Sequence, residues 1–334
     1  MLRKFRRYLL LLLAVLAVAF FLYKFRHAIT LQGFRWGMVI QSIREARLSL
    51  LILSLAAIYV CYALRALRWV RFCRWLGNAH FGNVYAATLM GFACTFLLGR
   101  AGEPIRPALI ARKDSLSMPG MFGVYVLERV FDFAATAVIA IFALLSFERK
   151  RVEGAGNDLL IKVSRSAGVG LLAGLVGAIV FLGLQGIRTW GDLAVLSGYT
   201  AAHWLLVVFV YLWIAQAFRG ELAALGLGGA ALVLAFTLVG SAVQLPGVGG
   251  GSQLATFLVF TLIFGVEKES AAMASIVVWL ITFAGCCIVG FPLLFREGWS
   301  MRDLRRMAQS GEQAGEAQLL ADAQQPALPG EKRR

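Results

Sequence analysis

The feature that most constrains this chain is a series of long apolar runs, separated by short polar segments, along most of its 334 residues. A helix needs about 20 mostly apolar residues to cross a bilayer, where its backbone groups must bond to one another. Hydrophobic residues make up 60% of the chain and charged residues 15%, whereas a soluble domain is about half apolar and about a quarter charged. The sequence therefore predicts an all-α fold, a polytopic transmembrane helical bundle.

Nine apolar runs are candidate spans, and we expect about eight spans, within a range of seven to nine. The third and eighth runs are short, and each adjoins a polar break that is rich in glycine. Each of these two runs is compatible with a full span or with a re-entrant half-helix. The nine runs are Tyr8–Tyr23, Leu48–Leu64, Val84–Leu98, Met121–Phe147, Val169–Leu184, Leu193–Phe218, Leu227–Leu245, Leu254–Val266 and Ala271–Phe295.

The polar segments divide the chain into three parts. Residues 1–47 are predicted to form a transmembrane helix and an interfacial amphipathic segment. Residues 48–295 form the main transmembrane domain, and residues 296–334 form a polar tail that we expect to be disordered. Basic residues before the first run favour a cytoplasmic N-terminus, and an even number of spans places the tail there too. We therefore expect a multi-pass protein of the cell membrane with both termini in the cytoplasm.

The strong positive charge of the chain does not indicate nucleic acid as a partner. The formal net charge is +15, from 33 basic and 18 acidic side chains. These basic residues cluster at the ends of apolar runs, where they set membrane orientation and contact anionic lipid headgroups. Membrane lipids are the expected partners.

The sequence GRAGEPIRP forms the first polar break. One helical turn would stack its charged residues Arg100, Glu103 and Arg106. Gly102 allows close backbone approach, and two prolines prevent a continuous helix. We expect a re-entrant segment in which the two arginines face a membrane cavity and Glu103 holds them.

A second charged set, Glu128, Arg129 and Asp132, lies inside the fourth apolar run. Each ionisable group at such a depth costs about 2.5–3.5 kcal/mol on insertion scales, so it normally faces a bundle interior or a wet cavity. Together with the charges of the first break, the set has three arginines and three acids. The alternatives are a neutral buried network that holds two segments together and a hydrated binding site.

The segment LRALRWVRFCRWL carries arginines at helical spacing, beginning with Arg65 and Arg68. One interpretation is a belt of side chains that reach the membrane surface, with Trp69 and Trp75 as interfacial anchors. The other is a phosphate site, because the guanidinium group matches phosphate oxygens with a rigid pair of donors. The sequence leaves both open for Arg65 and Arg68.

The sequence LPGVGGGSQL, Leu245–Leu254, forms the second break. Free backbone N–H groups at the start of the following helix would suit an anion, and the alternative is a flexible hinge. Both breaks end a short apolar run with glycine and proline, which is typical of transporters built from an internal repeat. The candidate binding residues of this break are Gly247, Gly249, Gly250 and Gln253.

Four motifs in order resemble the lysylphosphatidylglycerol synthase transmembrane-region family of flippase-like membrane proteins. They are LRALRW (64–69), GRAGEPIRP (99–107), LERVFD (127–132) and PGVGGG (246–251). The resemblance implies a bundle that moves lipids or lipid-linked sugars across a membrane, or that works beside the enzymes that make them. By this resemblance, the residues at family-like positions are Arg65, Arg68, Gly102, Glu103, Arg106, Glu128, Arg129, Asp132 and the glycines of Pro246–Gly251. The family often has an acid after the second break, where this chain has Gln253.

We therefore expect a lipid translocase that moves a phospholipid or a lipid-linked glycan, with the headgroup phosphate held by buried arginines. Only 39 residues follow the last run, too few for a soluble aminoacyl-transferase domain, so we expect no enzymatic activity. No nucleotide-binding or metal-binding motif is present, and we expect no cofactor and no metal. The histidines, including His203, are interpreted as ordinary helix residues. The alternatives are an enzyme that acts on polyprenyl phosphate or phospholipid, and an accessory subunit that binds a lipid-modifying enzyme.

Overall fold

The computed structural model describes residues 44–151, 190–241, 244–245 and 249–300, together with the isolated positions 41, 302, 303 and 306. The predicted first span, most of the interfacial segment, the run Val169–Leu184, Gly247 and nearly all of the tail lie outside the described residues. The predictions made for them, including the location of both termini, stay predictions.

The described chain is helical apart from one pair of two-residue strands, so the predicted all-α class is confirmed in its main feature. In the first half the helices are α4 (Leu48–Cys73), α5 (Phe81–Leu98), η1 (Gly99–Gly102), α6 (Ile105–Lys113) and α7 (Met118–Arg151). In the second half the elements are α9 (Trp190–Ala217), η2 (Gly220–Leu222), α10 (Leu227–Gly240), β1 (Gln244–Leu245), β2 (Gly249–Gly250), α11 (Gly251–Leu258), η3 (Val259–Ile263), α12 (Lys268–Trp279), η4 (Leu280–Ala284) and α13 (Cys287–Arg296).

Four described segments are long and apolar enough to cross a membrane: Leu48–Cys73, Phe81–Gly102, Gly191–Ala217 and Lys268–Arg296. Two shorter apolar helices are Leu227–Gly240 and Gly251–Ile263. The chain is thus a helical membrane protein, whereas the total of about eight spans stays a prediction.

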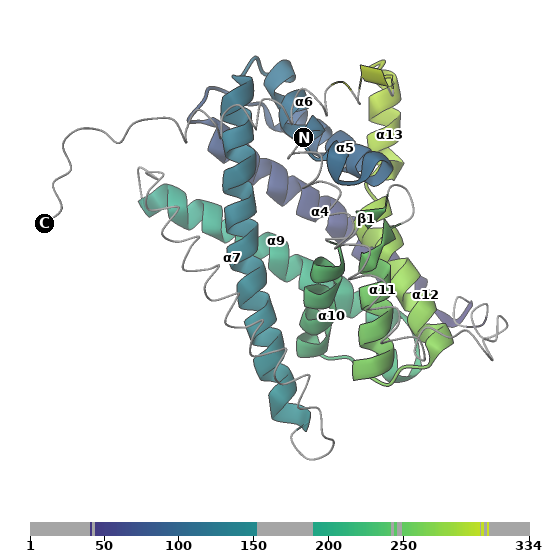
Figure 1. Cartoon of the computed structure of the whole chain (residues 1–334). Helices are drawn as coiled ribbons and strands as arrows, with labels where there is room; N and C mark the ends of the chain where they lie inside the picture. Colours follow the sequence, from purple (N-terminus) through teal and green to yellow (C-terminus); the bar gives the residue numbers. More distant parts are fainter. Residues whose placement is uncertain are drawn as a thin grey trace, which may run out of the picture.

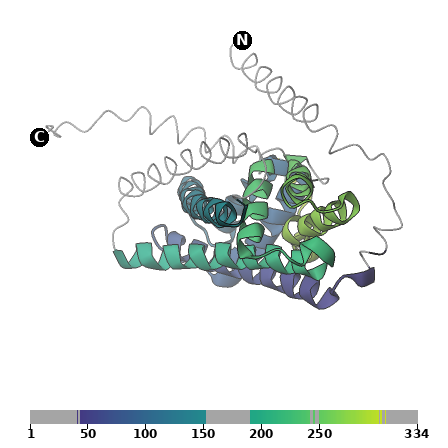
Figure 2. The ribbon, with the colours of Figure 1, turned by 90° about the horizontal axis from the view of Figure 1, so that it is seen from below.

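The long helices α4 and α9 are antiparallel and define the two ends of the bundle (Figures 1 and 2). The backbone N–H of Arg47, before α4, donates to the carbonyl oxygen of Ala217 at the end of α9 (2.8 Å). At the other end, Arg71 of α4 forms an ion pair of 2.7 Å with Asp192 at the start of α9. We call these the α4 start end and the α4 finish end.

The helix α7 connects these two ends and is the longest described helix, with 34 residues (Figure 1). A rise of about 1.5 Å per residue makes it roughly 50 Å long. Near its beginning, Gly120 lies against Leu76, just beyond α4. Near its other end, Ser146 lies against Gly228 in the first turn of α10. The charged residues of LERVFD therefore lie within the bundle and not in a terminal turn.

The first break is the tip of a helical hairpin formed by α5, η1 and α6. Gly99 ends α5 with a φ of 64°, in the left-handed region that favours glycine. Directly after α6, Asp114 accepts a hydrogen bond of 2.7 Å from the side-chain amide of Asn83 in the first turn of α5. The chain therefore goes out along α5 and comes back along α6 to the α4 finish end.

Gly102 and Gly91 allow the two arms of this hairpin to approach closely. A Cβ atom at Gly102 would lie 2.5 Å from the carbonyl oxygen of Cys94, and one at Gly91 would lie 2.5 Å from the Cβ of Arg106. Backbone atoms of α5 cannot move aside as a flexible side chain can. The structure thus gives Gly102 a packing role in positioning η1 and α6.

The second break is the tip of a similar hairpin, formed by α10 and α11, that begins at the opposite end of the bundle (Figure 1). The hydroxyl oxygens of Thr237 and Thr256 lie 2.6 Å apart between its two arms. Nearer the α4 start end, Gly229 lies against the ring of Phe264, which follows η3. The antiparallel strands β1 and β2 close the tip.

The tips of the two hairpins are in contact. Nη2 of Arg100, in η1, donates to the carbonyl oxygen of Ser241 at the end of α10 (3.4 Å). The elements η1 and β1 also lie side by side. Two segments that are about 145 residues apart in the sequence therefore meet in the structure.

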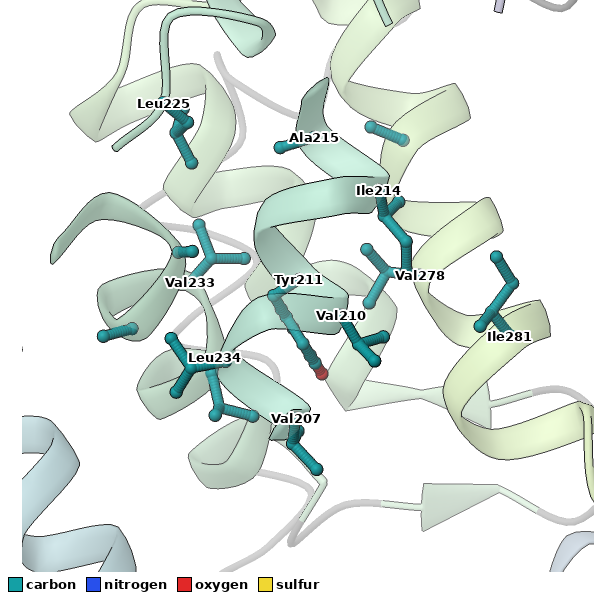
Figure 3. Packing of buried hydrophobic residues seen from close by; sticks show 14 of the residues in the cluster. Val207, Val210, Tyr211, Ile214, Ala215, Leu225, Val233, Leu234, Val278 and Ile281 are labelled. Atoms are coloured by element: carbon teal, nitrogen blue, oxygen red, sulfur yellow. The ribbon is translucent and has the colours of Figure 1, made fainter. Parts of the chain in front are cut away.

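Apolar packing holds the helices around this arrangement in two groups of buried residues. In the first group, α9 lies between α10 and the α12–η4 segment, and Figure 3 shows Val210 and Ile214 near Val278 while Leu234 lies on the other side of α9. The second group lies among α4, α5, α6 and α7 and includes the fully buried Trp69. In a membrane such close packing, rather than the hydrophobic effect, favours helix association.

The hairpin geometry predicts the sidedness of four exposed loop positions. In a variant without native cysteines, single cysteines at Asn78 and Ser117 should react with an impermeant maleimide from one face of sealed vesicles. Cysteines at Ala224 and Glu267 should react from the opposite face, because each hairpin returns to the end where it began. Labelling of Asn78 and Ser117 from opposite faces would contradict the out-and-back path of α5 and α6.

Candidate functional site

A buried cluster of charged residues lies where α4, α6 and α7 meet. We call it the ionic cluster. Its arginines and carboxylates come from segments far apart in the sequence, yet neighbouring pairs lie within 4 Å. Along α4, the cluster lies between the two apolar groups, because Tyr62 belongs to the first and Ala66 to the second. The members are Arg65 and Arg68 of α4, Arg106 of α6, and Glu128, Arg129 and Asp132 of α7.

Glu128 is the centre of the ionic cluster, and its side chain is fully buried. Arg68 donates to its Oε1 over 2.9 Å, and the Nε of Arg65 lies 3.7 Å from the same oxygen. Arg106 donates to both carboxylate oxygens, a bidentate arrangement that fixes the orientation of both groups. Arg129 donates to Oε2 over 3.2 Å. One carboxylate therefore contacts all four guanidinium groups.

Asp132, one helical turn after Glu128, extends the ionic cluster toward α9. Its Oδ1 accepts a hydrogen bond of 2.8 Å from Arg68 and one of 3.2 Å from Nε1 of Trp204. Its Oδ2 lies 3.3 Å from Nη2 of Arg65 and 3.6 Å from Nη2 of Arg129. The spacing of four residues between the two carboxylates places them on one face of α7.

Helix α9 adds neutral polar groups to the ionic cluster. Thr200 accepts a hydrogen bond of 2.9 Å from Nη1 of Arg68. Nε2 of His203 lies 3.2 Å from Nη2 of Arg65, and its Nδ1 lies 3.2 Å from the carbonyl oxygen of Cys61. A guanidinium group can only donate, so Nε2 accepts and Nδ1 carries the proton. His203 is therefore neutral in this arrangement.

Aromatic rings border the guanidinium groups. The Cζ of Arg106 lies 4.3 Å from the ring centroid of Trp69, and that of Arg65 lies 5.3 Å from the ring of Phe92. The Cζ of Arg129 lies 5.2 Å from the ring of Tyr125. A ring face attracts a cation most strongly where water is excluded.

The guanidinium groups of the ionic cluster are not fully satisfied by protein acceptors. The Nε–H groups of Arg65, Arg68 and Arg129 are buried, and no hydrogen-bond acceptor for them is found in the described part of the chain. A buried donor without an acceptor costs about 1–3 kcal/mol, and more when it is charged. The side chain of Arg129 is 40% exposed, whereas those of Arg65, Arg68 and Arg106 are 9% exposed or less. Arg129 is therefore the accessible part of the cluster.

The charge balance differs from the neutral network considered from the sequence. Four guanidinium groups contact two carboxylates. A third carboxylate, Glu103, bonds to Tyr125, whose ring lies against Arg129, so the formal excess is one positive charge. Buried charge is tolerated when it is paired. The ionic cluster and its surroundings thus carry more positive than negative charge.

The expected stack of Arg100, Glu103 and Arg106 is wrong. Arg106 turns to Glu128, Arg100 is exposed and bonds to Ser241, and Glu103 accepts a hydrogen bond from the hydroxyl of Tyr125. Pro104 and the close contact of η1 with α5 prevent the regular helical turn that the stack requires. The ionic cluster therefore includes Arg65 and Arg68 beside Arg106, whereas Arg100 and Glu103 are not among its members.

Two further interpretations are corrected. Trp69 is fully buried below Arg106 and is no interfacial anchor, whereas Trp75 is 43% exposed. His203 is buried in the cluster and is no ordinary helix residue. The signal for α9 was available, since Thr200, His203 and Trp204 are spaced three and four residues apart in an apolar run and so share one helical face.

Among the described residues of the second break, none has a hydrogen bond or an ion pair with a member of the ionic cluster. Gln253 accepts a hydrogen bond of 3.3 Å from the backbone N–H of Gly250 and so caps the start of α11. Gly250 has a φ of 95°, and Gly249 pairs with Leu245. The described geometry supports a structural role for these residues at the hairpin tip.

Replacing Glu128 with glutamine should destabilise the fold strongly. The change leaves four guanidinium groups with one carboxylate, and breaking a buried ionic network of this kind costs about 3–5 kcal/mol. Glu297→Gln, which removes a partly exposed ion pair with Lys113, is the matched control and should cost about 1 kcal/mol or less. Reversible unfolding in mixed micelles measures both changes. A loss at Glu128 no larger than that of the control would show that the carboxylate does not hold the cluster together.

Comparison with known proteins agrees with the motif analysis. The family described as the lysylphosphatidylglycerol synthase TM region matches residues 9–189, just over half of the chain. The match includes every member of the ionic cluster, whereas α9 and the second break lie beyond its end. No curated protein matches the chain. From the family match and the apolar helices, the chain belongs to a family of membrane proteins, the lysylphosphatidylglycerol synthase TM region family.

Proposed function

We propose that this protein binds the phosphate of an anionic membrane lipid at the ionic cluster and carries the lipid headgroup across the bilayer. The observation that carries the proposal is the excess of guanidinium groups over carboxylates in a buried site. Arginine pairs with phosphate through two parallel hydrogen bonds, which makes it well suited to this ligand.

The free-energy cost of burying the ionic cluster favours a function over a purely structural role. A buried ion pair is an inefficient source of stability, and apolar residues of similar size often stabilise a core as well. Six charged side chains and three buried donors without protein acceptors are therefore an expensive way to join α4 to α7. An anion that bonds to these donors offsets part of the cost.

The exposure of the arginines indicates the side from which a headgroup would reach the ionic cluster. Arg129 is the partly exposed cation of the ionic cluster, and Tyr125 lies one turn before it on α7. Tyr125 also donates to Glu103, which connects this side of the cluster to the first hairpin. A headgroup that reaches Arg129 first would pass between α7 and the hairpin tip to meet Arg65 and Arg68.

The two hairpins supply the moving parts in this proposal. We infer that both are re-entrant, because each leaves and returns to one end of the bundle and their tips meet between the ends. Among the described residues, a hydrogen bond of 3.4 Å joins Arg100 to Ser241, and it would break when the tips separate. Movement of one hairpin at a time would expose the ionic cluster to alternate sides, as in repeat-built transporters.

An enzymatic role is less well supported. A general acid or base must exchange its proton with the substrate. Glu128 and Asp132 already contact four and three guanidinium groups, so their oxygens are occupied and poorly placed to accept a proton from a substrate.

Transport by reconstituted protein tests the proposal. Wild-type protein in liposomes should move labelled anionic lipid between leaflets faster than empty liposomes do. Arg129→Gln should lower the rate by about tenfold or more, since a hydrogen bond to a charged group is worth roughly 1.5–3 kcal/mol. Arg71→Gln, on α4 but paired with Asp192 outside the cluster, should transport at the wild-type rate.

The proposal fails if the wild-type protein moves no anionic or glycosylated lipid faster than empty liposomes. It also fails if Arg71→Gln and Arg129→Gln reduce the rate equally, because the cluster would then have no special role.

A further inference from the structure

We infer that Glu103 is an internal anion that competes with the lipid phosphate at the accessible side of the ionic cluster and is displaced when the phosphate binds. This inference rests on the proposed function and adds a residue that sets the affinity and the charge selectivity of the site. Three features carry it: the place of Glu103, the way its carboxylate is held, and the partners that the carboxylate would share with a phosphate.

The first feature is the place of Glu103, which belongs to the first hairpin but lies beside the ionic cluster. It directly follows η1, and its carboxylate accepts a hydrogen bond from the hydroxyl of Tyr125 on α7. The ring of Tyr125 in turn lies against Arg129, whose Cζ atom is 5.2 Å from the ring centroid. One phenol ring therefore separates the carboxylate of Glu103 from the partly exposed cation of the cluster.

The second feature is that a neutral group, and not an arginine, holds this carboxylate. Among the described residues no ion pair joins Glu103 to Arg129, whereas Glu128 and Asp132 both contact Arg129 directly. A hydrogen bond from a phenol is lost at a lower cost than a buried ion pair. Glu103 is also half-buried, whereas Glu128 and Asp132 are buried. Of these three carboxylates, Glu103 is therefore the one that can leave most easily.

The third feature is that Glu103 and a bound phosphate would share the same partners. A phosphate at Arg129 would lie close to the carboxylate of Glu103, and like charges repel strongly where water is scarce. The hydroxyl of Tyr125 has one proton to donate, so it serves one of the two anions at a time. The phosphate and Glu103 are therefore alternative occupants of this side of the ionic cluster, and the binding of one displaces the other.

The variant Glu103→Gln tests the competition on the purified full-length protein. Glutamine keeps an oxygen that can accept from Tyr125 but removes the negative charge. The probes are phosphatidylglycerol and phosphatidylcholine with identical acyl chains, and native mass spectrometry or competition binding gives their affinities. Phosphatidylglycerol should bind about tenfold more tightly to the variant, because a like charge beside the site is lost. Phosphatidylcholine carries a cation that Glu103 attracts, so its affinity should rise about twofold or less.

Two further variants locate the effect within the chain. Glu297→Gln removes a carboxylate that pairs with Lys113 outside the ionic cluster, and it should leave both affinities unchanged. Tyr125→Phe removes the hydroxyl that holds Glu103 in place. In that background Glu103→Gln should raise the affinity for phosphatidylglycerol about threefold or less, since coupled residues are not additive. A full tenfold gain there would overturn the assignment of the competition to the contact with Tyr125.

The possible outcomes separate this inference from the proposed function. Unchanged or weaker binding of phosphatidylglycerol by Glu103→Gln would overturn the competition and leave the proposed function intact. If neither the wild-type protein nor Glu103→Gln binds phosphatidylglycerol more tightly than phosphatidylcholine, both fail. Inorganic phosphate at millimolar concentration should not displace phosphatidylglycerol, because it lacks acyl chains. Displacement would identify a free anion as the ligand and would also overturn both.

Discussion

The contact of one buried carboxylate with four guanidinium groups is the interaction on which the centre of this structure depends. Glu128 draws Arg65 and Arg68 from α4 and Arg106 from α6 to the face of α7. Without it, like charges would repel one another in surroundings of low dielectric constant, where the repulsion is strong. The same carboxylate cannot neutralise them all, even with the help of Asp132. The carboxylates therefore hold the arginines together but leave a formal positive charge, which is the property expected of a site for an anion.

The backbone provides the setting for this site. Glycine at positions 91 and 102 allows α6 to lie against α5 so closely that Arg106 reaches α7. The second hairpin approaches from the other end and meets the first at Arg100. The two tips lie against each other, and irregular backbone at membrane depth requires such cover. Fold and site thus depend on the same glycine-rich and proline-rich segments.

The sequence predicts the helices and the kinds of residue that form the site, but not which of these residues meet. Apolar runs of membrane length predict helices directly, and ionisable residues within them indicate a site because lipid penalises charge. Which charged side chains meet depends on how each helix is rotated about its axis and on the path that each hairpin follows. GRAGEPIRP was therefore expected to act as a unit, whereas the structure separates Arg106 from Arg100 and Glu103. Arg65 meets His203, and Arg68 meets Thr200, on facing sides of α4 and α9. Spacing within one helix cannot indicate such pairings.

The most direct test of the central claim is a structure determined by electron cryomicroscopy in nanodiscs that contain an anionic lipid. The account predicts density for a phosphate group within hydrogen-bond distance of at least two guanidinium groups of the ionic cluster, with Arg129 among them. Bonds from the phosphate oxygens to Nε–H groups that lack protein acceptors would complete the charge balance. Lipid phosphate bound only at the membrane surface, with the cluster closed and unchanged at high lipid occupancy, would contradict it.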